Sequence, residues 1–383
     1  MADINLLREA DLRQLFRLED LCYDDVVLYL GTTRTAEGKS EANARAILAF
    51  QTYGVVPRRN VGNVSCPRCN LQLLSKTDRS RGLGWRFKCV GGHQFSPFTN
   101  TLLENVRLND VGADRVLKLM FLWLDNMGVV QAAKYTRVAN DTAVAWYSYF
   151  RDIAQKIVWH DFLPIGGPDD IVEVDETHLF RRKCNVGRLV MFRRIWLFGG
   201  ISRSTKQCFA FVVHERSKEV LRPIMEQCIQ YESVICSDEW RAYTDCDDYF
   251  AEHETVNHSE NFLRPPKHED PMWVPGGRFN PNCLDKQWIG PPPAANMEPV
   301  RIHTQNIERL WRHLKKSLRK CQSVELVESY VGEFLYRYNI LKGIPGDRRR
   351  LVRFLSDTGR AYPGVGKERM EVDVMNCQCH ECV

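Results

Sequence analysis

Hydrophobic residues recur at helical spacing through the first 160 residues of the chain. Residues 1–55 repeat leucines on one face of short helices, and a polar stretch, residues 31–40, interrupts them. Residues 111–160 carry two longer apolar faces, separated by a short helical segment and a turn. Asn140 or Asp141 is placed to cap the last helix. This segment therefore predicts a helix-turn-helix-like module.

After residue 170 the pattern becomes that of β-strands. Five segments are rich in β-branched and aromatic residues: IVEVDETHL, RLVMFRRIWLFGGIS, QCFAFVVH, SVICSD and HETVNHS. A helix over residues 217–230 separates the third from the fourth, and two more are expected over 306–320 and about 324–338. The tail from Gly359 is weakly patterned. Strands followed by a crossover helix predict an α/β fold with a mixed sheet covered by helices.

Proline interrupts this α/β pattern. Residues 264–300 hold nine of the 17 prolines, which predicts an irregular insertion inside the domain.

Composition narrows the class of protein. The chain has 383 residues and a net charge of +5, which is too mild to name a partner. No window approaches 18 uninterrupted apolar residues, and the N-terminus lacks a basic n-region and an h-region, so we expect neither a membrane span nor a secretory signal. The 14 cysteines are then expected to stay reduced or to bind metal, in the cytosol or nucleus.

Three of the cysteines and one histidine have the spacing of a metal site. Cys66 and Cys69 form a C-x2-C pair, and Cys89 and His93 follow after a 19-residue spacer. Two close pairs joined by a hairpin can enclose tetrahedral zinc. Residues 56–110 also carry nine basic and three acidic residues, a local charge of +6. We interpret this segment as a zinc-ribbon-like basic module; the alternative is scattered reduced cysteines.

A second group of such residues lies at the C-terminus. It consists of Cys377, Cys379, His380 and Cys382. Adjacent ligands rarely close a tetrahedron unaided, so we interpret this group as a reactive tail rather than a metal site.

Acidic residues stand at buried strand positions. Asp175 lies within an apolar strand and Asp238 ends another. A carboxylate there is costly unless it is paired or holds a cation, and Mg²⁺ prefers a few carboxylates with water and phosphate oxygens. Glu308 is a third candidate, at the start of the helix over 306–320. Glu173, Glu176 and Glu239 are further candidate ligands, ranked below these three.

Glu308 also heads a row of bases along its helix. These are Arg312, Lys315, Lys316 and Arg319, at steps of three and four residues. The row fits a carboxylate that holds a metal beside bases that hold a phosphate backbone. A plain surface pair between Glu308 and Arg312 is the alternative.

Together these residues resemble a known family. The blocks VEVDET, SDEWRAY, NHSENF and HTQNIERLWRHLKK are similar, in content and order, to those of Merlin-type DDE transposases, eukaryotic relatives of a bacterial insertion-sequence group. The resemblance covers roughly residues 60–345. His93 stands where a cysteine is commoner, and the insertion lengthens the spacing between Asp238 and Glu308. His258, Ser259 and His303 lie in matching blocks without an assigned role.

The resemblance implies a ribonuclease H-like catalytic core in which Asp175, Asp238 and Glu308 bind Mg²⁺ or Mn²⁺. It further implies a structural Zn²⁺, double-stranded DNA as substrate (terminal inverted repeats and target), a homodimer or larger assembly, and a nuclear location, or a cytoplasmic one if the protein is bacterial. The expected function is metal-dependent DNA cleavage and strand transfer. A domesticated DNA-binding protein and a nuclease without strand transfer remain alternatives.

The expected organisation is an N-terminal helical segment, two DNA-binding modules, a catalytic domain and a tail. Their bounds are 1–55, 56–110 (zinc-ribbon-like), 111–160 (helix-turn-helix-like), 170–345 (catalytic, with the insertion 264–300) and 346–383.

Overall fold

The computed structural model describes most of the chain. The described residues are 2–18, 21–31, 33–59, 64–78, 83–104, 112–179, 195–238, 241–256, 278–279, 288–289, 303–318 and 323–371. The chain divides into two compact units, each described by itself. The first joins Met1–Asp161 to Ile340–Val374, and the second contains Phe162–Asn339.

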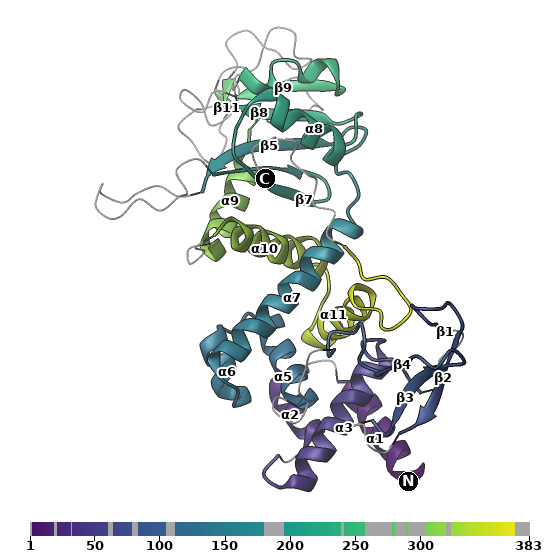
Figure 1. Ribbon diagram of the computed structural model, residues 1–383. Helices are drawn as coiled ribbons and strands as arrows, with labels where there is room; N and C mark the ends of the chain where they lie inside the picture. The colour runs from purple at the N-terminus through teal and green to yellow at the C-terminus, as the bar shows by residue number, and fades with distance from the viewer. Residues whose placement is uncertain are drawn as a thin grey trace. The chain divides into compact units, whose positions relative to one another are not determined.

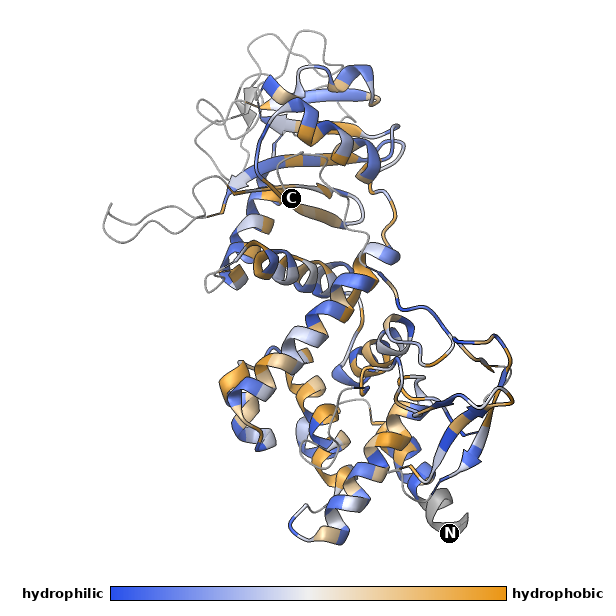
Figure 2. Cartoon of the chain, viewed as in Figure 1, coloured by the Kyte–Doolittle hydropathy of each residue, from blue (hydrophilic) through white to orange (hydrophobic). Residues whose placement is uncertain are grey.

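Helices form most of the first unit (Figure 1). They are α1 (Ala2–Leu15), α2 (Tyr23–Leu30), α3 (Ala36–Thr52), α5 (Ala113–Leu124), α6 (Val129–Thr136), α7 (Asn140–His160) and α11 (Asp347–Ala361). Most of them carry hydrophobic and hydrophilic residues together, as amphipathic helices do (Figure 2). The aromatic rings of Trp123, Phe150 and Phe354 meet where α5, α7 and α11 pack together.

Two local expectations about these helices change. Helix α7 already begins at Asn140, with Ala139 as its N-cap and no side-chain cap, so neither Asn140 nor Asp141 caps it. The expected tail, residues 346–383, begins with the helix α11 (Asp347–Ala361), and no helix was expected there. Leu351, Phe354 and Leu355 bury one face of it.

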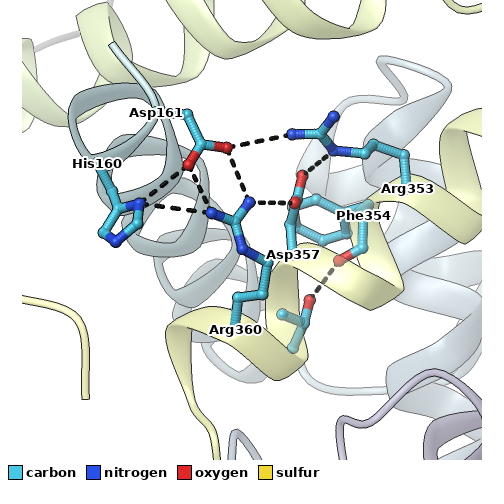
Figure 3. Close-up of polar contacts among 7 residues, drawn as sticks. His160, Asp161, Arg353, Phe354, Asp357 and Arg360 are labelled. Carbon is cyan, nitrogen blue, oxygen red and sulfur yellow. Dashed lines mark hydrogen bonds and ion pairs between the residues drawn. The ribbon is translucent and has the colours of Figure 1, made fainter. Parts of the chain in front are cut away.

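A polar network ties α11 to the end of α7 (Figure 3). Arg360 donates to both oxygens of Asp161, at 2.5 and 2.8 Å. The buried Asp357 accepts from Arg353 at 2.7 Å and from Arg360 at 3.3 Å. The hydrogen bond from Arg360 lowers the pKa of Asp161 to about 2. These contacts connect Asp161, where the chain leaves the first unit, to α11, which forms after the chain returns to that unit.

A small antiparallel sheet completes the first unit. Its strands, in spatial order, are β1 (Val64–Ser65), β2 (Gln72–Thr77), β3 (Trp85–Cys89) and β4 (Gln94–Phe95). Val365, near the end of the described chain, packs into the core of this sheet beside Trp85 and Phe87. Asn100 holds the same segment by donating to the carbonyl of Gly364 at 3.0 Å.

The second unit is built on a five-stranded mixed sheet. Its strands are β5 (Ile171–His178), β6 (Trp196–Ser202), β7 (Cys208–Val213), β8 (Val234–Asp238) and β9 (Glu252–Val256), in the order β7-β6-β5-β8-β9. The first three pair antiparallel, while β5–β8 and β8–β9 are parallel. This mixed α/β sheet is compatible with the ribonuclease H-like core expected from the sequence.

Helices connect and cover this sheet. Helix α8 (Lys218–Cys228) links β7 to β8. Helix α9 (Gln305–Ser317) packs on β5 and β6, and α10 (Val324–Leu335) packs on β7 and α9. A π-helical segment, Tyr336–Leu341, follows α10. Its Asn339 bonds both backbone groups of Cys208, which satisfies part of the edge strand β7.

Of the expected insertion, 264–300, two short strands are described: β10 (Arg278–Phe279) pairs antiparallel with β11 (Trp288–Ile289). The rest of the insertion, the C-terminal group of cysteines and His380, and Glu239, His258, Ser259 and Arg319 lie outside the described residues. Within the described part of the chain, every helix is too short or too polar to span a membrane.

Candidate active site

Two aspartates meet where β5 and β8 run side by side. The parallel register pairs Val172 with Ile235 and Glu173 with Cys236, and continuing it places Asp175 beside Asp238. Asp175, Glu176 and Asp238 each offer a carboxylate oxygen, and these three oxygens lie within 4.8 Å of one another. The structure thus brings together two of the three acids chosen from the sequence and adds Glu176.

Burial and mutual repulsion weaken the acidity of this cluster. Burial, then the charges of Glu176 and Asp238, raise the pKa of Asp175 to about 8. Burial also raises the pKa of Glu176 to about 7, although Tyr243 donates a 2.6 Å hydrogen bond to it. Like charges in a partly dry site favour either protonation or a bound cation. Three carboxylate oxygens at this spacing fit a hard divalent cation such as Mg²⁺.

Helix α9 is anchored beside the cluster, and its predicted apolar stripe is buried. The stripe consists of Ile307, Leu310, Trp311, Leu314 and Leu318. The indole N–H of Trp311 donates to Oδ2 of Asp175 at 3.0 Å. Nζ of Lys315 donates to Oγ1 of Thr177 at 2.5 Å.

Glu308 lies in the first turn of α9, on an exposed position. Its carboxylate does not join the three-residue cluster on β5 and β8, so its role as the third catalytic acid stays a prediction. Arg312 and Lys316 are also exposed on α9, as a row of phosphate-binding bases requires. Lys315 is half-buried because it reaches back to β5.

Glu173 holds the N-terminus of α9 instead of facing a metal. The fully buried carboxylate accepts from the backbone N–H groups of Asn306 and Ile307, at 2.8 and 3.2 Å. It also accepts from Arg203 at 2.7 Å and lies 3.3 Å from Nδ1 of His303. Glu173 lies two residues before Asp175, on the same face of β5, and these contacts account for a buried acid at that position. It also gives the buried His303 a place in the helix anchor.

Three residues near the site have contacts that the sequence pattern does not indicate. Glu176 was ranked low because the blocks centre on the aspartates, although it adjoins Asp175. Tyr243 closes the SDEWRAY block, and the pattern gave no reason to pair it with Glu176. Trp311 was counted only as an apolar helix residue, since helical spacing reports burial and not the direction of an N–H group.

The Cys/His group forms a second cluster, in the first unit. Sγ of Cys69 and Sγ of Cys89 are 3.6 Å apart, and Nδ1 of His93 is 3.6 Å from Sγ of Cys66 and of Cys89. Metal–ligand bonds of about 2.0 and 2.3 Å in a tetrahedron give edges of about 3.5–3.8 Å, so the spacing suits Zn²⁺. A Cβ at Gly91 would lie 3.3 Å from Sγ of Cys69, which explains the glycine in this turn.

Comparison with known proteins concerns the segment that holds the acidic cluster. Residues 168–268 match the ISXO2-like transposase domain family. This match supports the assignment of the chain to the DDE-type transposases. The matched segment contains Asp175, Glu176 and Asp238. It ends before α9, and it does not distinguish the Merlin type from related groups. No curated protein matches the chain.

Proposed function

We propose that the chain is a DNA transposase of the Merlin type, which binds terminal inverted repeats and catalyses metal-dependent DNA cleavage and strand transfer. The observation that carries the proposal is the carboxylate cluster of Asp175, Glu176 and Asp238 on adjacent parallel strands, inside the segment that matches a transposase domain. The mixed sheet and the helix anchored beside the cluster support it.

The residues of the chain supply position and charge. A divalent cation, when bound, would activate water or a 3′-hydroxyl and stabilise the leaving oxygen during in-line attack on a phosphodiester. Asp175 and Asp238 hold that cation in their ionised forms, with Glu176 or Glu308 as the third carboxylate. Arg312 and Lys316 are exposed along α9 and bind the DNA backbone, and Arg319 belongs to the same proposed row.

The Cys/His cluster is proposed as a structural Zn²⁺ site in a zinc-ribbon-like module. Its four ligands hold the two turns of the small sheet together, so we expect one zinc per chain and loss of local structure on chelation. Metal analysis of protein purified without chelator tests this. A protein without zinc, or one whose Cys66→Ser variant keeps its zinc, would contradict the assignment.

The remaining partners follow from the same proposal. Helices α6 and α7 with the small basic sheet are proposed to bind the inverted repeats. Pairing two transposon ends requires two active sites, so we propose a dimer or larger assembly. We propose a nuclear location, or a cytoplasmic one in a bacterium.

The decisive experiment follows cleavage and joining of labelled DNA carrying the element's ends. Asp175→Asn and Asp238→Asn should each abolish Mg²⁺-dependent cleavage and leave DNA affinity nearly intact, because each keeps its shape and loses the charge that holds the cation. Glu232→Gln, at an exposed position before β8, is the control and should cut normally. Normal cleavage by either aspartate variant would refute the assignment. Cleavage without joining would indicate a nuclease.

The third carboxylate is assigned by a paired comparison. Glu176→Gln and Glu308→Gln each remove one charge near the site without changing side-chain length. The variant that loses cleavage identifies the acid that completes the cation site. If Glu308→Gln cuts normally, Glu308 is only a surface residue of α9.

A further inference from the structure

Three successive contacts align helix α9 with strand β5. Alternate residues of β5 contact successive turns of the helix, and the pairs are Glu173 with Asn306 and Ile307, Asp175 with Trp311, and Thr177 with Lys315. Two residues of a strand advance about 6.7 Å, and four residues of a helix about 6 Å. The two elements therefore stay in step, and the middle contact falls on Asp175.

The space for this middle contact comes from a glycine. Gly199 on β6 pairs directly with Asp175. A Cβ at Gly199 would lie 2.8 Å from Cη2 of Trp311, so any other residue would press on the indole ring. Trp311 itself is buried, at 4% exposure. Packing thus fixes the ring, and the ring fixes the direction of its N–H group.

The chemistry of an indole suits a neighbour of a metal ligand. A carboxylate has about four lone-pair sites, so Asp175 can accept the indole N–H and still bind a cation. The indole nitrogen is a donor only and carries no charge, so it neither competes for the cation nor repels it. In metal sites generally, hydrogen-bond donors to a ligand side chain hold that side chain in its orientation.

From this geometry we infer that Trp311 is a positioning residue, which orients the carboxylate of Asp175 for divalent-cation binding. The inference rests on the proposed function, because it presumes a cation at Asp175 and Asp238. It goes further by giving α9 a role that depends on neither Glu308 nor the basic row. The helix serves the site through the hydrogen bond from its buried tryptophan.

The test compares metal binding in variants that keep or remove the N–H group. Trp311→Phe removes it and keeps an aromatic ring. Replacing Trp311 by benzothienylalanine puts sulfur in place of the N–H and keeps the shape of the ring, which guards against a variant that fails to fold. Leu310→Ala is the control, because it removes buried volume from the same helix without touching a hydrogen bond.

Two readouts are needed, and the first of them does not depend on activity. Direct Mn²⁺ titration of the protein, corrected with Asp175→Asn, gives the affinity of the site. The Mg²⁺ concentration that gives half-maximal cleavage shows how readily the bound metal supports the reaction. DNA affinity is measured in parallel. Loss of the N–H group should raise the Mn²⁺ dissociation constant and the Mg²⁺ concentration for half-maximal cleavage by roughly 10–100-fold. DNA affinity should stay unchanged.

The outcomes separate this inference from the proposed function. Unchanged metal affinity in both N–H-deleted proteins would overturn the positioning role, as would an equal shift in Leu310→Ala. If the wild-type protein binds no Mn²⁺ that depends on Asp175, the metal site itself is wrong and the proposed function fails with it.

Discussion

The carboxyl group of Asp175 holds its proton at a pH where an exposed aspartate is charged. Burial is the main cause, and the charges of Glu176 and Asp238 add to it. The same surroundings make the site a strong attractor for a cation, because a divalent ion cancels the repulsion that protonation otherwise relieves. Protonation and metal binding therefore compete at one group.

This competition predicts how stability depends on pH. The pKa of Asp175 rises from 3.8 to about 8 on folding, so the folded form keeps a proton that the unfolded chain releases. In chelator, the contribution of Asp175 to the free energy of unfolding should be full below pH 3.8 and fall as pH rises toward about 8. Mg²⁺ should restore stability, most strongly near pH 8.

Thermal unfolding of the wild type and of Asp175→Asn measures this directly. The variant cannot titrate at this position, so its stability should fall less over the same range in chelator. Equal pH slopes in the two proteins would show that the carboxyl group is not perturbed by folding.

At the scale of elements, the contact between α9 and the sheet depends on close approach. Gly199 allows it from the strand, and Trp311 fills the space from the helix. Gly199→Ala should destabilise the second unit by about 1–3 kcal/mol, the usual cost of overpacking. Its Cβ would lie 2.3 Å from the carbonyl oxygen of Phe209 as well as against the indole.

The control for this change is Gly343→Ala, where an added Cβ meets nothing within 4 Å. Chemical unfolding curves of the two variants give the comparison. A Gly199→Ala protein as stable as the control would mean that α9 does not pack as described.

The bases on the exposed face of α9 support a separate prediction about DNA affinity. Arg312 and Lys316 lie one turn apart, whereas Lys315 is engaged with Thr177. Arg312→Ala combined with Lys316→Ala should weaken binding to all sequences and reduce the salt slope by about 0.9 for each lost phosphate contact. Binding measured over a series of salt concentrations tests this, and an unchanged slope would leave the row as an ordinary solvated surface.

At the scale of the whole molecule, the first unit is assembled from both ends of the chain. The segment after residue 340 supplies α11 and the arginines of the Asp161 network (Figure 3). It also supplies Val365, a core residue of the small sheet that carries the Cys/His cluster, here called the Cys/His module. A fragment of residues 56–160 lacks all three. We therefore expect fragments that contain the helices and small sheet of the first unit to fold only when residues 340–371 are present.

Val365 offers a sharper test of that dependence. Val365→Asp places a charge in the core of the Cys/His module and should destabilise the first unit by about 3 kcal/mol or more. Lys367→Asp introduces the same side chain two residues away at an exposed position and should have little effect. Thermal unfolding and zinc content of the two proteins decide, and equal stability would refute the packing of the returning segment.

Local pattern was a good guide to elements and a poor guide to some of their ends. The strands around Asp175 and Asp238 and the helix around Glu308 are where periodicity placed them, because alternation and helical spacing report burial along a single element. Helix α7 begins one residue too early for Asn140 to cap it, and α11 was missed. The sequence of α11 is rich in arginine, so its apolar face is not obvious from the pattern. That face packs only when the chain returns to the first unit.

The amino-acid sequence was enough to select the candidate residues: two aspartates on buried strands, and four cysteine and histidine side chains in two close pairs. Tertiary contacts were needed to show that Glu176 lies with the aspartates, that Trp311 donates to Asp175, and that Val365 packs in a core whose other residues lie some 280 positions earlier. The physical reason is range. Burial follows a periodic pattern within one element, whereas a hydrogen bond or a shared core depends on the register and close approach of elements distant in the chain.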